Sequence, residues 1–567
     1  MIKKEDIKYY DYPNPRWRRK DYKLLDKECD FYIYDNETDT IKSKSKILLP
    51  FSYETLKSGI NDQNMYKHVL YEINFEIAEI TNYLLHFNAV DYECNVYLND
   101  AYVGSHKGGF TSFSFDISKF IKKGNNVLKV DVHDSFSKEQ LRGKQREIKD
   151  SHECWYVQTT GIYQSVYLEK CGNKYIEYAK FSGDENGNVN YEIKTTGKEL
   201  LNVDICFDNE TIKSFTLKDA ILYKGSFKVD NAKLWSLNTP NLYDVKLTLN
   251  SSIIDYVETY FGFRSVKVNN GYIYLNNQKE FLKFILNQGY YKDQGLTLTK
   301  ENILQDFNLM KEFGFNGCRI HQKVEQPLLY YLADRFGFLL WSELPSCYEY
   351  SNKMKEEINN DLFNIIDQNY NSPSIITYVI FNESWGIPQI NNNEEVQSYV
   401  SLLKDKVKKY DDTRLVIAND GWFNLSNTDI LSLHEYQQDA NELYKCYNDK
   451  NNITNNYIVN GYGKAFANNN KYQNQPIMLT EFGGIAIQDQ DGWGYGDKAN
   501  NLDTLKNRMN DLFKAIYKLN YLSGFCYTQL ADVEQETNGL VYENRKLKLP
   551  IDEVKSIVNG NYYKANK

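Results

Sequence analysis

The chain has 567 residues, a formal net charge of −9 and 25% charged residues that are spread without long runs. Because this length is too great for a single hydrophobic core, we expect several domains. The sequence has neither the strongly basic face of a nucleic-acid-binding protein nor an apolar run of roughly 20 residues, so we expect no nucleic-acid partner and no membrane.

The cysteines and the first residues of the chain predict a cytoplasmic protein. Nine cysteines are scattered singly, without the CxxC pairs of zinc ribbons and redox dithiols. The start, MIKKEDIKYYDYPNP, has no apolar segment of the about 7–15 residues that a signal peptide contains. An odd number of thiols in such a chain indicates reduced, mostly buried cysteines.

Two series of short strands are expected before the middle of the chain. Alternating runs such as NYLLHFNAV, ECNVYLND and NVLKVDVHD, separated by Asn, Asp and Gly, predict an N-terminal β jelly roll in residues 1–172. A weaker series from NVNYEIKTTG to YVETYFGF predicts an immunoglobulin-like β-sandwich in residues 173–264. Both domains would be built of antiparallel strands joined by turns.

After Phe263 the pattern changes to apolar runs that alternate with helical stretches. In one such stretch Ile303, Phe307 and Met310 recur at helical spacing before Gly314. Eight apolar runs predict a C-terminal (β/α)8 TIM barrel in residues 265–567, with no room for a full helix between the fifth and sixth runs. The runs are 280–288, 315–321, 338–346, 375–383, 414–420, 430–436, 476–481 and 523–530.

Two of these runs, IITYVIFNE and PIMLTE, each end on a glutamate, Glu383 and Glu481. Barrel enzymes keep their catalytic groups at the C-terminal ends of the strands, and two carboxylates facing one pocket are the minimal equipment for cleaving a glycosidic bond. We therefore expect Glu383 to be the general acid and base and Glu481 to be the nucleophile. Arg319 is a natural partner to hold the nucleophile ionised.

Other polar and aromatic residues gather at the strand ends and in the loops that follow them. We expect the substrate-binding residues to be Arg319, His321, Lys323, Asn382, Trp385, His434, Tyr436 and Trp493. Structural alternatives stay open: the histidines as buried core residues, Arg319 as an ion pair within the barrel, and Trp493 as an anchor for its glycine-rich loop. Glu343 fits either a supporting carboxylate or a residue of the barrel interior.

A metal-dependent barrel hydrolase that uses His321, His434 and carboxylates is the main mechanistic rival. Such enzymes usually carry several histidines at strand ends, and the first run, FLKFILNQ, has none. We therefore expect no metal and no cofactor.

At these residues the chain resembles glycoside hydrolase family 2. FNES, with Glu383, resembles the acid/base motif of that family, and TEFGG, with Glu481, resembles its nucleophile motif. WYVQTTGIYQSVYLE resembles part of its sugar-binding jelly roll, and FGFRSVKVNNGYIYLNNQ resembles the start of its barrel. The resemblance spans nearly the whole chain and implies the same three domains.

The resemblance implies a retaining exo-β-glycosidase that acts on an oligosaccharide or small glycoside, with a β-galactosidase-like specificity expected first. β-Mannosidase or β-glucuronidase specificity, or a non-catalytic carbohydrate-binding barrel, are the alternatives, and homo-oligomerisation stays open. After the second run the chain has Arg319-Ile-His-Gln-Lys-Val where many members have Arg-x-Ser-His-Tyr-Pro. The Asn-x-Lys signature of glucuronidases is not recognisable near ETNGLVYENRK, and Lys323 or Arg545 are its candidate substitutes.

Overall fold

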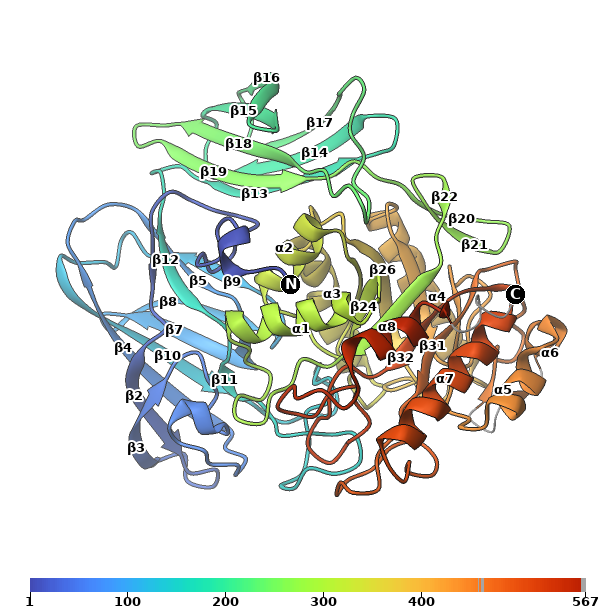
Figure 1. Cartoon of the computed structure of the whole chain (residues 1–567). Helices are drawn as coiled ribbons and strands as arrows, with labels where there is room; N and C mark the ends of the chain where they lie inside the picture. The colour runs from blue at the N-terminus through green and yellow to red at the C-terminus, as the bar shows by residue number, and fades with distance from the viewer. Residues whose placement is uncertain (457, 460–462, 562–567) are drawn as a thin grey trace.

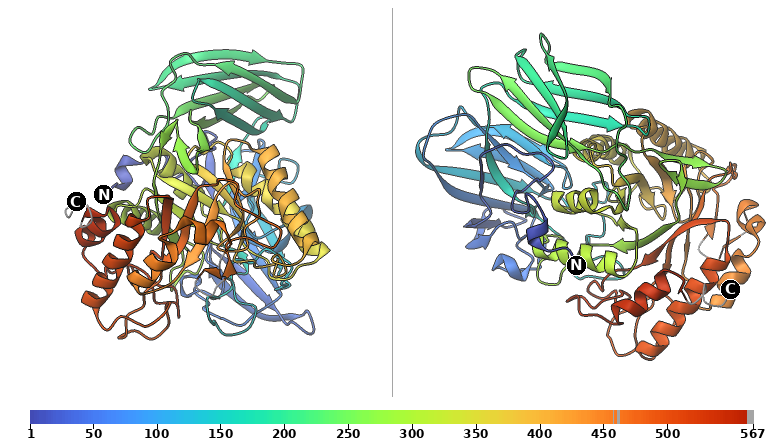
Figure 2. Two further views of the ribbon diagram at one scale, coloured as in Figure 1. Left: turned by 90° about the vertical axis from the view of Figure 1, so that its right-hand side faces the viewer. Right: turned by 45° about the horizontal axis from the view of Figure 1, so that its top comes forward.

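A computed structural model describes residues 1–456, 458–459 and 463–561, so the last residues of the predicted barrel domain, 562–567, lie outside the described residues. The fold class that the sequence predicts, a jelly roll, an immunoglobulin-like sandwich and a TIM barrel, is confirmed. The jelly roll (blue) lies beside the barrel, and the immunoglobulin-like sandwich (green) lies above both (Figure 1). Two further views show the same arrangement (Figure 2).

Two antiparallel sheets form the jelly roll, because apolar residues alternate along their strands and fill the space between the sheets. In β4, for example, Val69, Tyr71 and Ile73 are fully buried while the residues between them are partly exposed. One sheet contains β1 (Tyr22–Leu24), β12 (Val166–Lys170), β5 (Tyr83–Phe87) and β9 (Phe113–Asp116). The other contains β3 (Ile41–Leu48), β2 (Glu28–Tyr34), β4 (His68–Ile77), β10 (Gly124–His133), β7 (Glu93–Leu98) and β8 (Ala101–Lys107).

The second domain is a smaller sandwich of antiparallel strands around its own core. One sheet contains β13 (Ile176–Gly183), β14 (Asn188–Thr195) and β17 (Leu222–Lys228). The other contains β16 (Glu210–Leu217), β15 (Leu200–Phe207), β18 (Tyr243–Asn250) and β19 (Asp255–Phe261). A three-stranded hairpin, β20 (Val266–Asn269), β21 (Tyr272–Leu275) and β22 (Gln278–Lys279), leads from it to the barrel.

The barrel has all eight strands that the apolar runs predict, and its adjacent strands pair in parallel. Their order around the sheet is β27-β26-β25-β24-β23-β32-β31-β28. The bounds are β23 (Leu282–Asn287), β24 (Gly317–Ile320), β25 (Leu339–Glu343), β26 (Ile375–Asn382), β27 (Leu415–Asp420), β28 (Leu431–Glu435), β31 (Ile477–Gly483) and β32 (Leu522–Thr528). Every residue of β26 is buried, as expected of a parallel strand covered on both faces.

Helices cover the outside of the barrel (Figure 1). They are α1 (Lys300–Glu312), α2 (Pro327–Phe336), α3 (Asn352–Gln368), α4 (Glu394–Tyr410), α5 (Ala440–Tyr447), α6 (Lys450–Thr454), α7 (Leu502–Lys518) and α8 (Ile551–Val558). The short interval between β27 and β28 contains no helix, as its length predicts. Backbone hydrogen bonds from Asp429 to Val416 (3.0 Å) and from His434 to Gly421 (3.1 Å) cross the gap between these two edge strands. Within the described residues, no helix has both the length and the apolar composition that crossing a bilayer requires.

Candidate active site

Two glutamates meet at the C-terminal mouth of the barrel. Glu383 follows β26 directly and Glu481 lies in β31, and a carboxylate oxygen of each lies within 4.8 Å of the other and of a ring nitrogen of His434. Glu383 has a φ of 49° and Ser384 a φ of 63°, which is the left-handed region that non-glycine residues rarely adopt. The amide of Ser384 donates to Asn419 Oδ1 of β27 (3.0 Å), and this bond helps to hold the strained turn in place. Strain of this kind is concentrated at functional sites.

Arg319, at the end of β24, connects the acidic groups of the mouth. It is fully buried, and its Nε donates to Glu343 Oε2 at 2.7 Å. Its Nη1 lies 2.5 Å from Asp420 Oδ2 and 2.8 Å from Glu481 Oε1. Burial opposes the charge of the guanidinium, but Asp420, Glu343 and Glu481 more than offset it, so the pKa of Arg319 lies well above the usual arginine value. The fork of the guanidinium thereby fixes where the Glu481 carboxylate sits.

His434, in β28, links the two glutamates. Its Nδ1 lies 2.8 Å from Glu383 Oε1 and 3.6 Å from Glu481 Oε2, and its Nε2 lies 3.3 Å from Asp420 Oδ2. Burial favours the neutral ring, but the charges of Glu481 and Asp420 outweigh it and raise the pKa of His434 to about 10. The ring is therefore an imidazolium at neutral pH, and both of its N–H groups donate to carboxylates.

A second contact orients Glu481. The hydroxyl of Tyr436 donates to Glu481 Oε2 and lies 3.1 Å from Thr528 Oγ1. The ring of Tyr436 stacks on Tyr495, which in turn meets Trp493 edge-on with 5.4 Å between ring centroids. Both oxygens of Glu481 are thus held, one by Arg319 and one by Tyr436.

The structure brings most of the predicted site residues to this mouth. Asn382 accepts a hydrogen bond from Arg319 Nη2 through its Oδ1 (2.6 Å), which leaves its NH2 group as the donor for another partner. His321 Nδ1 lies 3.2 Å from Glu343, and burial, helped by Lys144 and Arg319, lowers its pKa well below the usual value, so the ring is neutral. Glu343 is therefore a supporting carboxylate that holds both Arg319 and His321.

Trp385 lies just after Glu383 and is half-buried. Its ring centroid is 5.8 Å from that of Trp155, a residue of the jelly-roll domain, and 5.5 Å from that of Tyr348. These three rings form an aromatic group that includes Trp385, two residues after Glu383, and such a surface is one on which sugars and aromatic groups stack.

Lys323 and Trp493 hold loops in place. Lys323 is buried, and its Nζ lies 3.0 Å from Glu325 Oε2 and 3.2 Å from the Gly289 carbonyl. The indole of Trp493 donates to the Glu153 carbonyl (2.8 Å), which ties its loop to the jelly roll. For Trp493 this is the anchoring role that the sequence left open.

Several contributors to the mouth were not among the predicted site residues, namely Asp420, Tyr495, Lys144, Trp155, Tyr348 and Thr528. Asp420 ends the fifth predicted strand and could have been found by the same strand-end rule that selected Glu383. Tyr495 lies in the loop of Trp493. Lys144 and Trp155 come from the loop between β10 and β11 (Gly161–Ile162), far from the barrel in sequence, and no pattern in the sequence placed either of them at the barrel mouth.

In the described part of the chain, two groups of side chains have ligand atoms of the type and spacing that could bind a metal cation. The first is Glu383, His434 and Glu481. A metal could bind there only after His434 loses a ring proton, because only a neutral imidazole has a lone pair to offer. The second group is His68, Asp131 and His133 on the surface of the jelly roll, remote from the mouth.

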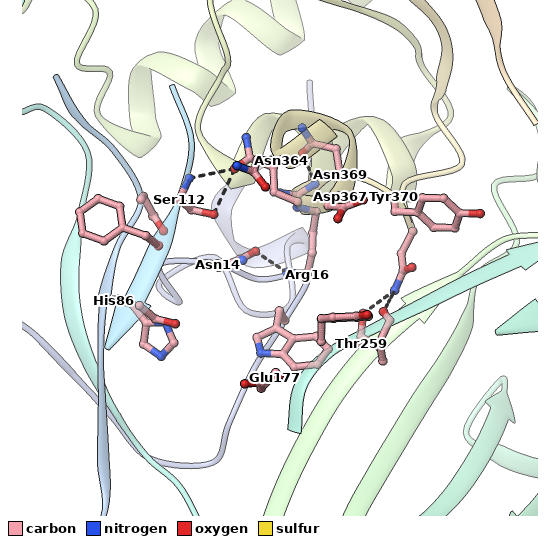
Figure 3. Close-up of a pocket in the computed structure, with 18 of the residues that line it drawn as sticks. Asn14, Arg16, His86, Ser112, Glu177, Thr259, Asn364, Asp367, Asn369 and Tyr370 are labelled. Carbon is pink, nitrogen blue, oxygen red and sulfur yellow. Dashed lines mark hydrogen bonds between the residues drawn. The ribbon is translucent and has the colours of Figure 1, made fainter. Parts of the chain in front are cut away.

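A separate cavity of about 470 Å³ lies where the three domains meet (Figure 3). Its lining includes Arg16, His86 of β5, Thr259 of β19, and Asn369 after α3. Two of these lining residues are joined by a hydrogen bond, from Arg16 Nη1 to Asn369 Oδ1 at 2.6 Å. Glu383 and Glu481 do not line this cavity, so it is distinct from the barrel mouth.

Three family models match consecutive parts of the chain. They are "Glycosyl hydrolases family 2, sugar binding domain" over residues 47–171, "Glycosyl hydrolases family 2" over 155–264 and "Glycosyl hydrolases family 2, TIM barrel domain" over 266–560. The chain belongs to glycoside hydrolase family 2. The last of these models alone matches more than half of the chain, and the resemblance that the sequence motifs indicated is confirmed.

Individual relatives are more distant. A "Putative beta-glucuronidase" of Formosa agariphila is 28% identical over 61% of this chain and 43% of its own length. A "Beta-galactosidase" of Thermoanaerobacterium thermosulfurigenes is 26% identical over 67% of this chain and 54% of its own length. The chain thus spans about half the length of these curated relatives. The solved structure of a β-D-glucuronidase from Dictyoglomus thermophilum has a TM-score of 0.79 and 20% identity over 97% of this chain and 98% of that one, and it supports the fold.

Proposed function

We propose that this chain is a retaining exo-β-glycosidase, which removes a terminal β-linked sugar through a covalent glycosyl-enzyme. The observation that carries the proposal is the spacing of the two glutamates, whose carboxylate oxygens lie within 4.8 Å of each other. Retaining glycosidases hold their carboxyl groups about 5–5.5 Å apart, whereas inverting enzymes leave about 6.5–9.5 Å for a water molecule.

The two carboxylates differ in ways that match two roles. Glu481 is 5% exposed and fixed from both sides by Arg319 and Tyr436, as a nucleophile aimed at one carbon atom requires. Glu383 is 17% exposed and precedes Trp385 by two residues, and a departing aglycone would lie against the aromatic group of Trp385. We therefore assign attack on the anomeric carbon to Glu481, and protonation of the leaving oxygen, then deprotonation of water, to Glu383.

The remaining predicted residues have supporting roles in this proposal. The NH2 of Asn382, beside Glu383, makes no hydrogen bond to the described residues and would donate to the 2-hydroxyl of the sugar, a bond that strengthens as the transition state forms. The imidazolium of His434 lies between the carboxylates of Glu383 and Glu481. It would stabilise their negative charge while Glu383 transfers its proton to the leaving oxygen. Neither role needs a metal or a cofactor.

The nucleophile is tested by azide rescue of the Glu481→Ala variant. With an activated aryl glycoside, azide should take the place of the missing carboxylate and give an α-glycosyl azide. The Glu383→Ala variant is the matched control, because azide would there intercept the glycosyl-enzyme and give the β-anomer. A β-azide from Glu481→Ala would reverse the two assignments.

The activity itself is tested on p-nitrophenyl β-galactoside, β-glucuronide, β-mannoside, β-glucoside and α-arabinoside. The Glu481→Ala variant serves as the blank. Turnover of at least one substrate that this variant loses is the expected result. A wild-type protein that binds such glycosides without turning any of them over would instead be a non-catalytic carbohydrate-binding barrel.

A further inference from the structure

A loop of the jelly-roll domain forms part of the barrel mouth. It runs between β10 and β11, and Figure 1 shows it (teal) beside the C-terminal loops of the barrel (red). The amides of Arg142 and Gly143 donate to the Ser346 carbonyl, at 2.9 and 3.0 Å, in the loop after β25. A Cβ on Gly143 would lie 2.0 Å from the Gln322 carbonyl oxygen, so a side chain there would push the two loops apart. This close approach sets the position of the next residue, Lys144.

Lys144 is a buried cation without a hydrogen bond. Its side chain is 8% exposed, and its ion-pair partner, Glu536 Oε2, lies 3.8 Å from Nζ. Within the described residues, no acceptor lies within hydrogen-bond distance of this ammonium. Glu536 itself already accepts hydrogen bonds from the Tyr156 hydroxyl and from Asn538 Nδ2 (3.1 Å). An ammonium has three protons to donate, and burying it with an ion pair at 3.8 Å but no hydrogen-bond acceptor is costly, so the arrangement favours a ligand that accepts them.

The two basic residues that the sequence offered for this task are already paired. Lys323 is held by Glu325 and by the Gly289 carbonyl. The guanidinium of Arg545 donates to both oxygens of Asp306, at 2.9 and 3.0 Å. Lys144 is therefore the cation of the three whose donors are left for a substrate.

Lys144 lies on the side of the barrel mouth toward which carbon 5 of a bound sugar would point. Glu536 lies in the loop after β32. In the order of strands around the eight-stranded barrel, β32 is the fourth strand from β26, so β32 and β26 lie on opposite sides of the barrel. Carbons 2 and 5 of a pyranose likewise lie across the ring from each other. A sugar whose 2-hydroxyl meets Asn382, after β26, would direct the substituent on carbon 5 toward Glu536 and Lys144.

We propose that Lys144 is a specificity-determining residue, and that its ammonium binds a carboxylate on carbon 5 of the terminal sugar, so that the substrates are β-linked hexuronides. A carboxylate would supply the missing acceptors as a charge-assisted pair, which the hydroxymethyl group of a neutral hexose cannot do. This inference rests on the proposed glycosidase function. It departs from the galactoside specificity that the sequence led us to expect.

The test compares four p-nitrophenyl substrates, the β-glucuronide and β-galacturonide with the β-glucoside and β-galactoside, on the wild-type protein and on Lys144→Met. Methionine has a similar length and no charge. Truncating one partner of a buried charged pair costs about 2–5 kcal/mol, which corresponds to a fall of roughly 30- to 4,000-fold in kcat/KM for the preferred uronide. The neutral glycosides should lose far less, so the selectivity ratio should collapse.

Two further variants separate recognition from folding. Lys404→Met removes an equally buried lysine, whose side chain is also 8% exposed and pairs with Asp429 (2.8 Å) outside the mouth, and it should leave the selectivity ratio unchanged. Lys144→Arg keeps the charge and should retain the uronide preference. If Lys144→Met does not fold, the same preference can be tested by inhibition of the wild-type protein. Free glucuronate and galacturonate should then inhibit more strongly than glucose and galactose.

The possible outcomes distinguish this inference from the function on which it rests. Glu481-dependent turnover of neutral glycosides, with no uronide preference in the wild-type protein, would overturn the role of Lys144 and leave the glycosidase proposal standing. Absence of Glu481-dependent turnover on every substrate would overturn both. A uronide preference that survives Lys144→Met would show that another group binds the carboxylate.

Discussion

Replacing Arg319 by lysine is the sharpest test of how the nucleophile is positioned. The guanidinium makes four contacts at once, with Glu343, Asp420, Glu481 and Asn382. A lysine ammonium keeps the charge but is a single point on a flexible stem and cannot reproduce that planar fork. The substitution therefore separates geometry from charge.

The size of the effect follows from the contacts. Hydrogen bonds to charged groups contribute about 1.5–3 kcal/mol each, and breaking a buried ion pair costs about 3–5 kcal/mol. Since lysine would hold some of these partners, we expect Arg319→Lys to lower the free energy of unfolding by about 3–5 kcal/mol. Loss of one oriented donor in an active site typically lowers kcat by about 10²–10³-fold, and we expect a fall of that order as Glu481 becomes free to move.

Arg414→Lys is the matched control. Arg414 is also buried, and it donates to Asp411 (2.7 Å) and to the carbonyls of Tyr370 (2.7 Å) and Ser372 (2.8 Å), at the opposite end of the same barrel. Both variants should unfold at lower temperature, followed by circular dichroism. The fall in kcat, measured well below that temperature, should belong to Arg319→Lys alone. Equal values of kcat for the two variants would refute the positioning argument.

Three further predictions concern the same mouth. The pKa of His434 is raised to about 10 from an unfolded value of about 6.5, so its ion pairs stabilise the fold fully below pH 6.5 and are lost as the pH rises through about 10. The wild-type unfolding midpoint should therefore fall more steeply between pH 7 and 10 than that of His434→Gln, and parallel curves would contradict the assignment. Tyr436→Phe removes a donor to Glu481 and should lower kcat about 10–100-fold with little change in KM; an unchanged kcat would mean that Arg319 alone suffices. Gly143→Ala places a side chain at a φ of 59° and against the Gln322 carbonyl, so thermal unfolding should show a loss of about 1–3 kcal/mol and KM should rise; a wild-type KM would argue that this loop does not shape the sugar site.

The sequence by itself determined the fold and the two glutamates. Strands buried on both faces read as continuous apolar runs, so all eight barrel strands could be predicted from local composition. The end of a parallel strand is also the rim of the barrel, and for this reason Glu383 and Glu481 could be paired without knowing any contact. The same rule would have found Asp420 had it been applied to the fifth strand.

The tertiary structure decided which of the remaining polar residues are free to meet a ligand. Lys323 and Arg545 looked like candidates in the sequence, but each is occupied by a carboxylate. Glu325, two residues along the chain, holds Lys323, and Asp306, which long-range packing brings close, holds Arg545. Lys144 belongs to a different domain, and its place beside Glu536 depends on how the jelly roll packs against the barrel. Local patterns specify strands and their ends, whereas the pairing of charges depends on contacts between residues hundreds of positions apart, which periodicity does not encode.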